Sequence, residues 1–155
     1  MRSGRRLAID VGKVRIGVAA CDFHGILASG VETVARTQDQ ASAISRLVVL
    51  VAEIDPIEIY VGLPVSMQGQ TTESTKDAIQ FAKQLAQAVS SEVRFIDERM
   101  TTVTAANALR SSGRDSKSGR KIIDQIAATV ILEAALEQEK GSGKQPGKSL
   151  GEVNE

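Results

Sequence analysis

Three carboxylates stand at positions where an isolated charge is costly. Asp10 ends a run of apolar residues typical of a buried strand, and Glu98 directly follows a second such strand. Asp124 falls at the edge of the apolar stripe of the last expected helix. Taken singly, each acid is explained by an ordinary strand end, loop or helix boundary. Taken together, they come from remote elements that can converge at one end of a sheet, which favours a shared task.

The task that suits three carboxylates without histidine or cysteine is the binding of a hard cation. Oxygen ligands suit Mg²⁺ or Mn²⁺, whereas zinc would call for histidine or cysteine ligands. Two such ions about 4 Å apart can activate water and stabilise the leaving oxygen of a phosphodiester. Asp10, Glu98 and Asp124 are therefore predicted to be metal ligands.

Basic residues are clustered, although the formal net charge is zero. The zero net charge argues against coating nucleic acid by bulk charge, and the low aromatic content argues against a base-stacking reader of single strands. A solvated surface and a phosphate-binding surface remain equally good interpretations of the clusters. They comprise Arg2, Arg5 and Arg6 near the start, and Arg110, Arg114, Lys117, Arg120 and Lys121 later.

The elements that must position these residues follow from periodicity and turn signals. Strands are expected at 6–11, 15–21, 30–35, 57–62 and 93–96. Helices are expected from Thr37 or Asp39 to Glu53, from Glu73 to Val89, from Thr101 or Thr102 to Leu109, and from Ile122 to Gln138, with a loop at 111–119.

This order predicts an α/β fold with a mixed five-stranded sheet and helices on both faces. The first three strands form an antiparallel meander because their connections are short, and the later strands alternate with helices and so pair in parallel. One domain is expected at 1–138, followed by a flexible tail at 139–155, whose Gly, Ser, Lys and acidic residues bury little apolar surface.

Composition also bears on the cellular location and the oligomeric state of the protein. No apolar run approaches the length of a bilayer span, and the start of the chain lacks the apolar core of a signal peptide. Cys21, the single cysteine, can form no internal disulfide; it is expected in the core, or else it cross-links two subunits. His24, the only histidine, is expected at the surface. We expect a cytoplasmic protein that is a monomer or weak homodimer.

Four sequence blocks in order resemble the YqgF/RuvX family over residues 6 to 137. These blocks are Asp10–Ala19, Val61–Pro64 with Gly69, Asp97–Thr102 with Ala105, and Asp124–Ala128. The resemblance implies an RNase H-like fold related to the RuvC Holliday-junction resolvases. It also implies a nuclease that matures the 5′ end of pre-16S ribosomal RNA, with junction resolution as a second role, so that the partner is pre-ribosomal RNA or branched DNA.

The resemblance also implies roles for individual residues. Asp10, Glu98 and Asp124 become the catalytic acids, and Arg15, Arg99, Thr101 and Thr102 become groups that position phosphate. The expected nucleic-acid contacts are these four positioning residues and five further basic residues. The five are Lys13, Arg114, Lys117, Arg120 and Lys121.

One departure from the wider superfamily is the missing fourth acid near Asp124. Positions 120, 121, 127 and 128 are Arg, Lys, Ala and Ala, and Asp97 is expected to point away from Glu98. A second ion would then bind weakly without substrate, and modest intrinsic activity or dependence on a partner is expected.

Two other functions remain open. The Asp-x-Gly hairpin at residue 10 also occurs in actin/hexokinase-like phosphotransferases, which need two such domains to close on a nucleotide. A catalytically silent RNA-binding factor of ribosome assembly would keep the fold without needing the acids.

Overall fold

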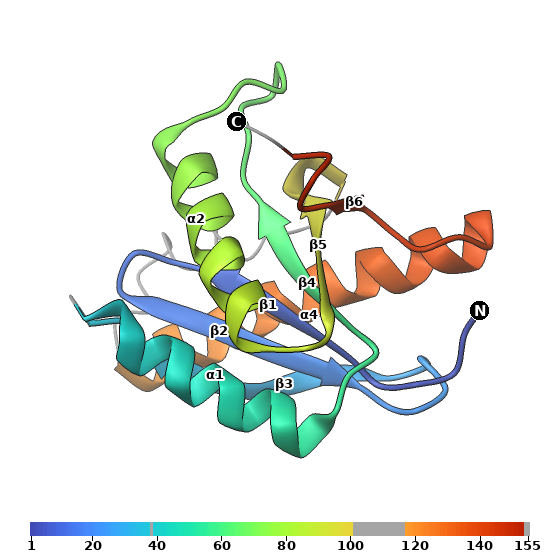
Figure 1. The fold of residues 1–155 in the computed structure, drawn as a ribbon, viewed down its shortest axis with the longest axis horizontal. Coiled ribbons are helices and arrows are strands. Elements are labelled where there is room, and N and C mark those ends of the chain that lie inside the picture. The colour runs from blue at the N-terminus through green and yellow to red at the C-terminus, as the bar shows by residue number, and fades with distance from the viewer. Residues whose placement is uncertain (38, 101–116, 154–155) are drawn as a thin grey trace.

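A mixed six-stranded sheet, seen in a computed structural model, organises the chain (Figure 1). The structure describes residues 1–37, 39–100 and 117–153. The strand order is β3-β2-β1-β4-β5-β6. The strands are β1 Arg6–Val11, β2 Arg15–Cys21, β3 Ala28–Ala35, β4 Glu58–Leu63, β5 Glu92–Asp97 and β6 Lys148–Ser149. As predicted, β1, β2 and β3 form an antiparallel meander, and β1, β4 and β5 pair in parallel.

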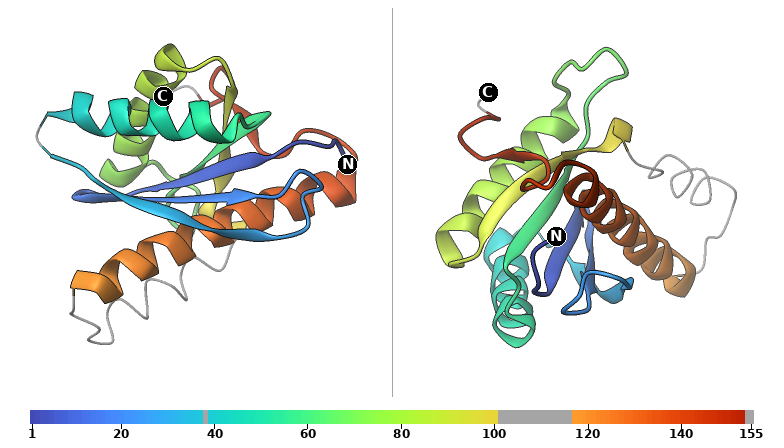
Figure 2. Two further views of the ribbon diagram at one scale, coloured as in Figure 1. Left: turned by 90° about the horizontal axis from the view of Figure 1, so that it is seen from below. Right: turned by 90° about the vertical axis from the view of Figure 1, so that its right-hand side faces the viewer.

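Helices cover both faces of the sheet (Figure 2). Helices α1 (Gln40–Ile54) and α2 (Glu73–Ala88) pack on one face, and α4 (Lys117–Ser142) packs on the other. Asp39 caps α1 by accepting a hydrogen bond from the amide of Ala41, and Thr72 closes a capping box with Thr75 at the start of α2. The first two predicted helices are confirmed. No described helix is long and apolar enough to cross a membrane.

Alternation along the central strand decides which face each side chain meets. Leu7 and Ile9 of β1 belong to the apolar cluster beneath α1 and α2, whereas Ala8 belongs to the cluster beneath α4. Asp10 continues the series of Ala8 and is therefore directed to the face that α4 covers. That cluster is rich in alanines with no exposed surface, so α4 lies close to the sheet; they include Ala8, Ala19, Ala128 and Ala135.

The strand count and the last helix differ from expectation. The sheet has six strands, because Lys148 and Ser149 pair antiparallel with Phe95 and Arg94 of β5. Helix α4 begins at Lys117 and ends at Ser142, beyond both expected limits, and the expected helix at 101–109 lies outside the described residues. A two-residue strand is too short to carry a hydrophobic period, which explains why the pattern did not predict it.

The segment after Gln138 was expected to be a flexible tail, and its described part lies against the sheet instead. Leu150 and Val153 pack on the core beneath α1 and α2. The Arg94 guanidinium donates hydrogen bonds to the carbonyl oxygens of Pro146 and Gly147, at 2.7 and 3.1 Å. The segment has few apolar residues, and it is held on the sheet by these two apolar side chains together with hydrogen bonds to a residue far along the chain.

Candidate catalytic site

Asp10 lies between two strands that offer glycine on the same face. In the sheet register Asp10 is directly opposite Gly17 of β2. On its other side β4 runs parallel, with Val61 opposite Ile9, so Gly62 is the next residue along. Glycine lacks a Cβ, so each of these two positions leaves space above the sheet.

Asp124 takes the space above Gly17. A Cβ built on Gly17 would collide with the carbonyl oxygen of Asp124 and would lie 3.2 Å from the Asp124 Cβ. The backbone of α4 therefore touches β2 at this point. Asp124 is only 5% exposed, so a residue predicted at the edge of the helix stripe is buried against the sheet.

Glu98 takes the space above Gly62. A Cβ built on Gly62 would lie 2.7 Å from Glu98 Oε2 and 2.5 Å from Ile131 Cδ1 of α4. Glu98 begins a short 3-10 helix directly after β5, which turns its side chain back over β4. The two glycines thus mark the places of Asp124 and Glu98 on either side of Asp10.

Arg15 neutralises the buried Asp124. The Arg15 Nε donates a hydrogen bond to Asp124 Oδ2 at 2.7 Å, and the Asp124 side chain is 7% exposed against 28% for Arg15. A buried carboxylate requires such a partner, and a guanidinium in direct contact is a strong one. Arg15, expected to position groups in the site, therefore contacts one of the three acids.

The acids share a face, but they do not form a closed set of ligands. Within the described ranges, no three Asp, Glu, His or Cys side chains are grouped closely enough to hold a metal ion. Instead, Arg15 engages one oxygen of Asp124. The donor set is nevertheless the right one for Mg²⁺ or Mn²⁺, because all three side chains offer carboxylate oxygens.

Asp97 lies away from these acids, as the pleat of β5 predicted. It lines a cavity with Leu63 and Lys148 and pairs with Arg99, whose Nη2 lies 2.6 Å from Asp97 Oδ2. Hydrogen bonds from Arg99 hold the pKa of Asp97 below its usual value, although partial burial opposes that shift. Arg99 also donates to the carbonyl oxygen of Met67, so in this structure it joins the end of β5 to the loop after β4.

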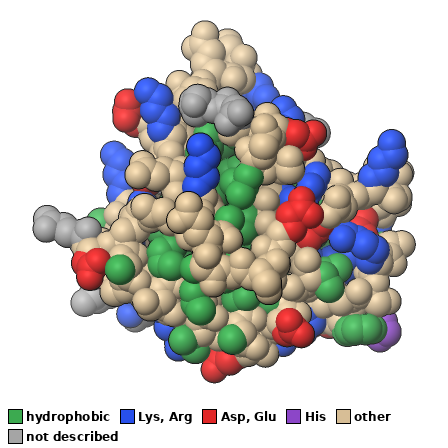
Figure 3. Space-filling model, viewed as in Figure 1, with side chains coloured by type: hydrophobic (Ala, Val, Ile, Leu, Met, Phe, Trp, Pro, Cys, Tyr) green, Lys and Arg blue, Asp and Glu red, His purple; other side chains and the backbone are tan. Residues whose placement is uncertain are grey.

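The remaining predicted contacts are only partly described. Lys13, Arg120 and Lys121 are exposed, and Lys117 is the first residue of α4. Thr101, Thr102 and Arg114 lie outside the described residues. On the face covered by α1 and α2, described basic and acidic side chains are interspersed and form no continuous basic tract (Figure 3). Cys21 is buried and free, and His24 is exposed, as expected.

The fold is shared with solved RuvC structures. The Thermus thermophilus RuvC structure superimposes with a TM-score of 0.60 at 14% identity, covering 92% of this chain and 99% of that one. A T. thermophilus RuvC in complex with Holliday junction substrate gives a TM-score of 0.61 at 13% identity, with the same coverage. The fold class predicted from the sequence is therefore confirmed.

Family membership follows from a model match that spans most of the chain. The model of the RuvX family, described as Holliday junction resolvase, matches residues 4–138. The chain belongs to the RuvX family. A Streptomyces coelicolor relative is 52% identical over 151 residues, covering 97% of this chain and 90% of the relative. A Clavibacter sepedonicus relative is 50% identical over 147 residues, covering 95% and 91% respectively. Both relatives carry the name "Putative pre-16S rRNA nuclease".

RuvX membership covers the segments that carry all three acids. The matched residues 4–138 include Asp10, Glu98 and Asp124, and they also include the two glycines that accommodate the acids. Sequence reasoning selected the acids but missed Gly17 and Gly62. The available signal was that both glycines interrupt strands of apolar residues, where a glycine often marks a close approach.

Proposed function

We propose that this RuvX chain is a divalent-metal-dependent endonuclease for structured nucleic acid, with Asp10, Glu98 and Asp124 as its metal-binding carboxylates. The observation that carries the proposal is the pair of gaps beside Asp10: Gly17 makes room for Asp124, and Gly62 makes room for Glu98. Three acids on one face at one edge of a sheet repel one another unless positive charge lies between them, so this arrangement favours a cation there.

The chain's own residues divide the work. Asp10, Glu98 and Asp124 would hold Mg²⁺ or Mn²⁺, which supplies activation of water and stabilisation of the leaving oxygen, with one or two ions bound. Arg15, which pairs with Asp124, would be free to bind a phosphate oxygen if a cation took over the charge of Asp124, and a guanidinium binds phosphate well. The exposed Lys13, Arg120 and Lys121 would neutralise neighbouring phosphates.

For the substrate we propose the precursor of 16S ribosomal RNA, cleaved at its 5′ end. Support comes from the relatives of about half-identical sequence that carry this activity in their names. The family description favours a second candidate, resolution of four-way DNA junctions, which requires a dimer because such junctions are symmetric. We place the protein in the cytoplasm, as a monomer or weak homodimer.

Two alternatives make different demands on the acids. A phosphotransferase would need a second domain to close on a nucleotide, and the RuvX model accounts for residues 4–138 without one. A catalytically silent assembly factor would retain RNA binding and its cellular role when an acid is neutralised.

The decisive experiment is a cleavage assay in Mg²⁺ or Mn²⁺ with a pre-16S leader RNA and a four-way DNA junction. Wild type is compared with Asp10→Asn and Asp124→Asn, and with Asp22→Asn as a matched control. Asp22 caps the turn between β2 and β3 through the amides of Ile26 and Leu27, far along β2 from Gly17. We expect cleavage of the leader by wild type and Asp22→Asn, and a loss of at least about 100-fold in both acid variants.

Other outcomes identify the alternatives. Preferred cleavage of the junction by a dimer would replace the RNA substrate by DNA. Equal cleavage by all four proteins would mean that the activity comes from a contaminant. Leader binding without cleavage, together with full cellular function of Asp10→Asn, would favour the assembly factor.

A further inference from the structure

A small cavity lies on the face of the sheet opposite Glu98. We name it the loop cavity; the loop at residues 64–71 forms one wall, and the C-terminal segment forms another. Its volume is about 200 Å³. Its lining includes the apolar side chains of Leu63, Ile79 and Val153 and the polar side chains of Thr71, Asp97 and Lys148.

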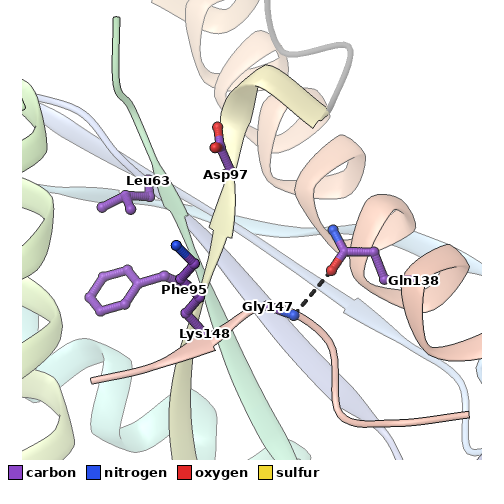
Figure 4. A pocket seen from close by; sticks show the side chains of 6 residues that line it. All are labelled: Leu63, Phe95, Asp97, Gln138, Gly147 and Lys148. Carbon is purple, nitrogen blue, oxygen red and sulfur yellow. Dashed lines mark hydrogen bonds between the residues drawn. The ribbon is translucent and has the colours of Figure 1, made fainter. Parts of the chain in front are cut away.

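The loop cavity adjoins the end of β5, where Glu98 follows. Asp97, which lines it, is followed directly by Glu98, which lies over Gly62 on the opposite face. A second cavity of about 260 Å³ shares Leu63, Asp97 and Lys148 with the loop cavity and is also lined by Gln138 of α4 (Figure 4). Together the two cavities reach from the loop after β4 to the helix that carries Asp124.

Each wall of the loop cavity is held in place by specific contacts. Arg99 bridges Asp97 and the carbonyl oxygen of Met67, and a Cβ on Gly69 would lie 3.1 Å from Arg99 Nη1, so the loop packs directly on the guanidinium. In the opposite wall, Glu152 accepts a hydrogen bond from the amide of Ser149 at 2.8 Å. The C-terminal wall lies beyond residue 138, where the RuvX family model ends.

The volume and the charges of the loop cavity indicate which kind of ligand it can bind. Pockets for drug-sized molecules have volumes of roughly 300–1,000 Å³, so the loop cavity suits a smaller group. Its two cationic side chains, Arg99 and Lys148, are balanced by Asp97 and Glu152, which disfavours a phosphate or a metal ion. The lining combines the apolar side chains of Leu63, Ile79 and Val153 with a larger share of polar surface. Such a mixture suits an uncharged ring that carries hydrogen-bonding edges, and a nucleobase is such a ring.

We propose that the loop cavity binds one unpaired nucleobase, from a nucleotide next to the phosphodiester that is cleaved. The base leaves its stack, crosses the carboxyl end of β5 and inserts between the apolar side chains, while Asp97, Lys148 and Thr71 bind its edge. This inference rests on the proposed nuclease function and adds a subsite that selects the cleavage position. Side chains of the C-terminal segment then take part in substrate recognition.

The test combines a cavity-filling variant with abasic substrates. Thr71→Phe places a ring in the cavity from its exposed rim, and Gln70→Phe is the matched control, because Gln70 is the exposed neighbour and does not line the cavity. An RNA cleaved at one position is prepared with a single abasic nucleotide at each flanking position in turn. In wild type, one abasic position should lower kcat/KM about tenfold, as expected for the loss of one bound base.

The proposal predicts that Thr71→Phe lowers kcat/KM on the intact RNA about tenfold and is insensitive to the same abasic position. Gln70→Phe should behave as wild type. Lys148→Ala, compared with Lys144→Ala in the same segment, gives a second pair in case the ring disturbs folding, which thermal melts reveal. Of these two lysines, Lys148 lines the cavity and Lys144 does not.

The outcomes separate this inference from the proposed function. Cleavage that no flanking abasic nucleotide slows, or an abasic effect that persists in Thr71→Phe and Lys148→Ala, overturns the base-binding site and leaves the nuclease standing. Absence of cleavage by wild type on every substrate overturns the nuclease, and the base-binding site with it.

Discussion

The Asp124 carboxylate has two requirements to meet, a countercharge for stability and free oxygen lone pairs for a metal ion. Asp124 is buried, so it needs a positive partner for the fold to be stable, and Arg15 supplies it at 2.7 Å. A metal ligand must also present free lone pairs to the ion. Removal of Arg15 should therefore harm the metal-free protein more than the metal-loaded protein, because the ion can replace the guanidinium as the countercharge.

Arg15→Gln tests this exchange without any activity measurement. We expect the free energy of unfolding without metal to fall by about 2 kcal/mol, because Asp124 loses a charged partner that is itself partly exposed. Millimolar Mg²⁺ should restore more stability to Arg15→Gln than it adds to wild type. Urea titrations in Mg²⁺ and in EDTA measure the free energy of unfolding of each protein with and without metal. Equal stabilisation of the two proteins by Mg²⁺ would contradict the replacement of Arg15 by the ion at Asp124.

Gly62 allows the position of Glu98 to be tested separately from folding. In Gly62→Ala the added Cβ meets Glu98 Oε2 at 2.7 Å and Ile131 Cδ1 at 2.5 Å, and both are side-chain ends that can move. We expect the stability to fall by only about 1–2 kcal/mol. Cleavage should fall about 100-fold because Glu98 is displaced.

Gly141→Ala is the control for Gly62→Ala, because a Cβ there would have nothing within 4 Å. It should leave cleavage unchanged and not lower the melting temperature. Cleavage by Gly62→Ala at the wild-type rate would show that the position of Glu98 does not matter.

The three acids could be selected from the sequence, whereas their surroundings could not. Asp10 and Glu98 are conspicuous at the ends of apolar strands and Asp124 at the edge of an apolar helix stripe, and the family resemblance added Arg15. The fit of Asp124 above Gly17 depends on residues 107 positions apart in the chain, brought together only when α4 packs on β2. Periodicity reports which face a residue takes and carries no information about what lies above it.

At the scale of elements, α4 connects the candidate catalytic edge to a buried polar cluster at the opposite end of the sheet. Glu139, 2% exposed near the end of α4, pairs with Arg6 of β1 and with Arg2. Arg2 also pairs with Glu58 of β4, at 2.7 Å. Hydrogen bonds from Arg2 lower the pKa of Glu139 to about 2, against a burial effect that raises it. The N-terminus is thereby fastened to the helix that carries Asp124.

Glu139→Gln should lose a stabilisation that depends on pH. The pKa of Glu139 falls from 4.5 to about 2 on folding, so its contribution of about 3 kcal/mol is complete above pH 4.5 and disappears as the pH falls toward 2. The difference in unfolding free energy between wild type and Glu139→Gln should therefore be large at pH 7 and small near pH 2. Glu137→Gln, an exposed acid on the same helix, is the control. A difference that does not change with pH would contradict the lowered pKa.

The elements themselves were predictable wherever a hydrophobic period was long enough to read. Helices α1 and α2 end within one or two residues of the expected limits, because each carries three or more turns of apolar spacing and a capping side chain. Helix α4 was predicted too short, since its last turns are polar and are held by Glu139 rather than by apolar contacts. Its first turns were assigned to a loop because Ser118 and Gly119 are typical loop residues.

At the scale of the whole molecule, the C-terminal segment completes a sheet that would otherwise end at β5. Strand β6 pairs with Phe95 and Arg94, and Gln138 Oε1 accepts a hydrogen bond from the Gly147 amide at 3.0 Å. An uncovered strand edge promotes pairing between molecules. The segment therefore contributes to both stability and solubility, in addition to its place in the wall of the loop cavity.

Deletion of residues 143–155 tests whether the segment belongs to the fold. It removes the apolar contacts of Leu150 and Val153 and leaves the buried Arg94 without the carbonyl oxygens of residues 146 and 147. We expect the free energy of unfolding to fall by about 3 kcal/mol, since two partly buried side chains and two hydrogen bonds are lost. Light scattering should also show concentration-dependent association, because the edge of β5 is exposed. If the truncated chain keeps the wild-type urea midpoint and remains monomeric, residues 143–155 are instead the flexible tail that composition alone predicts. These residues could then not form a wall of the loop cavity that holds a base.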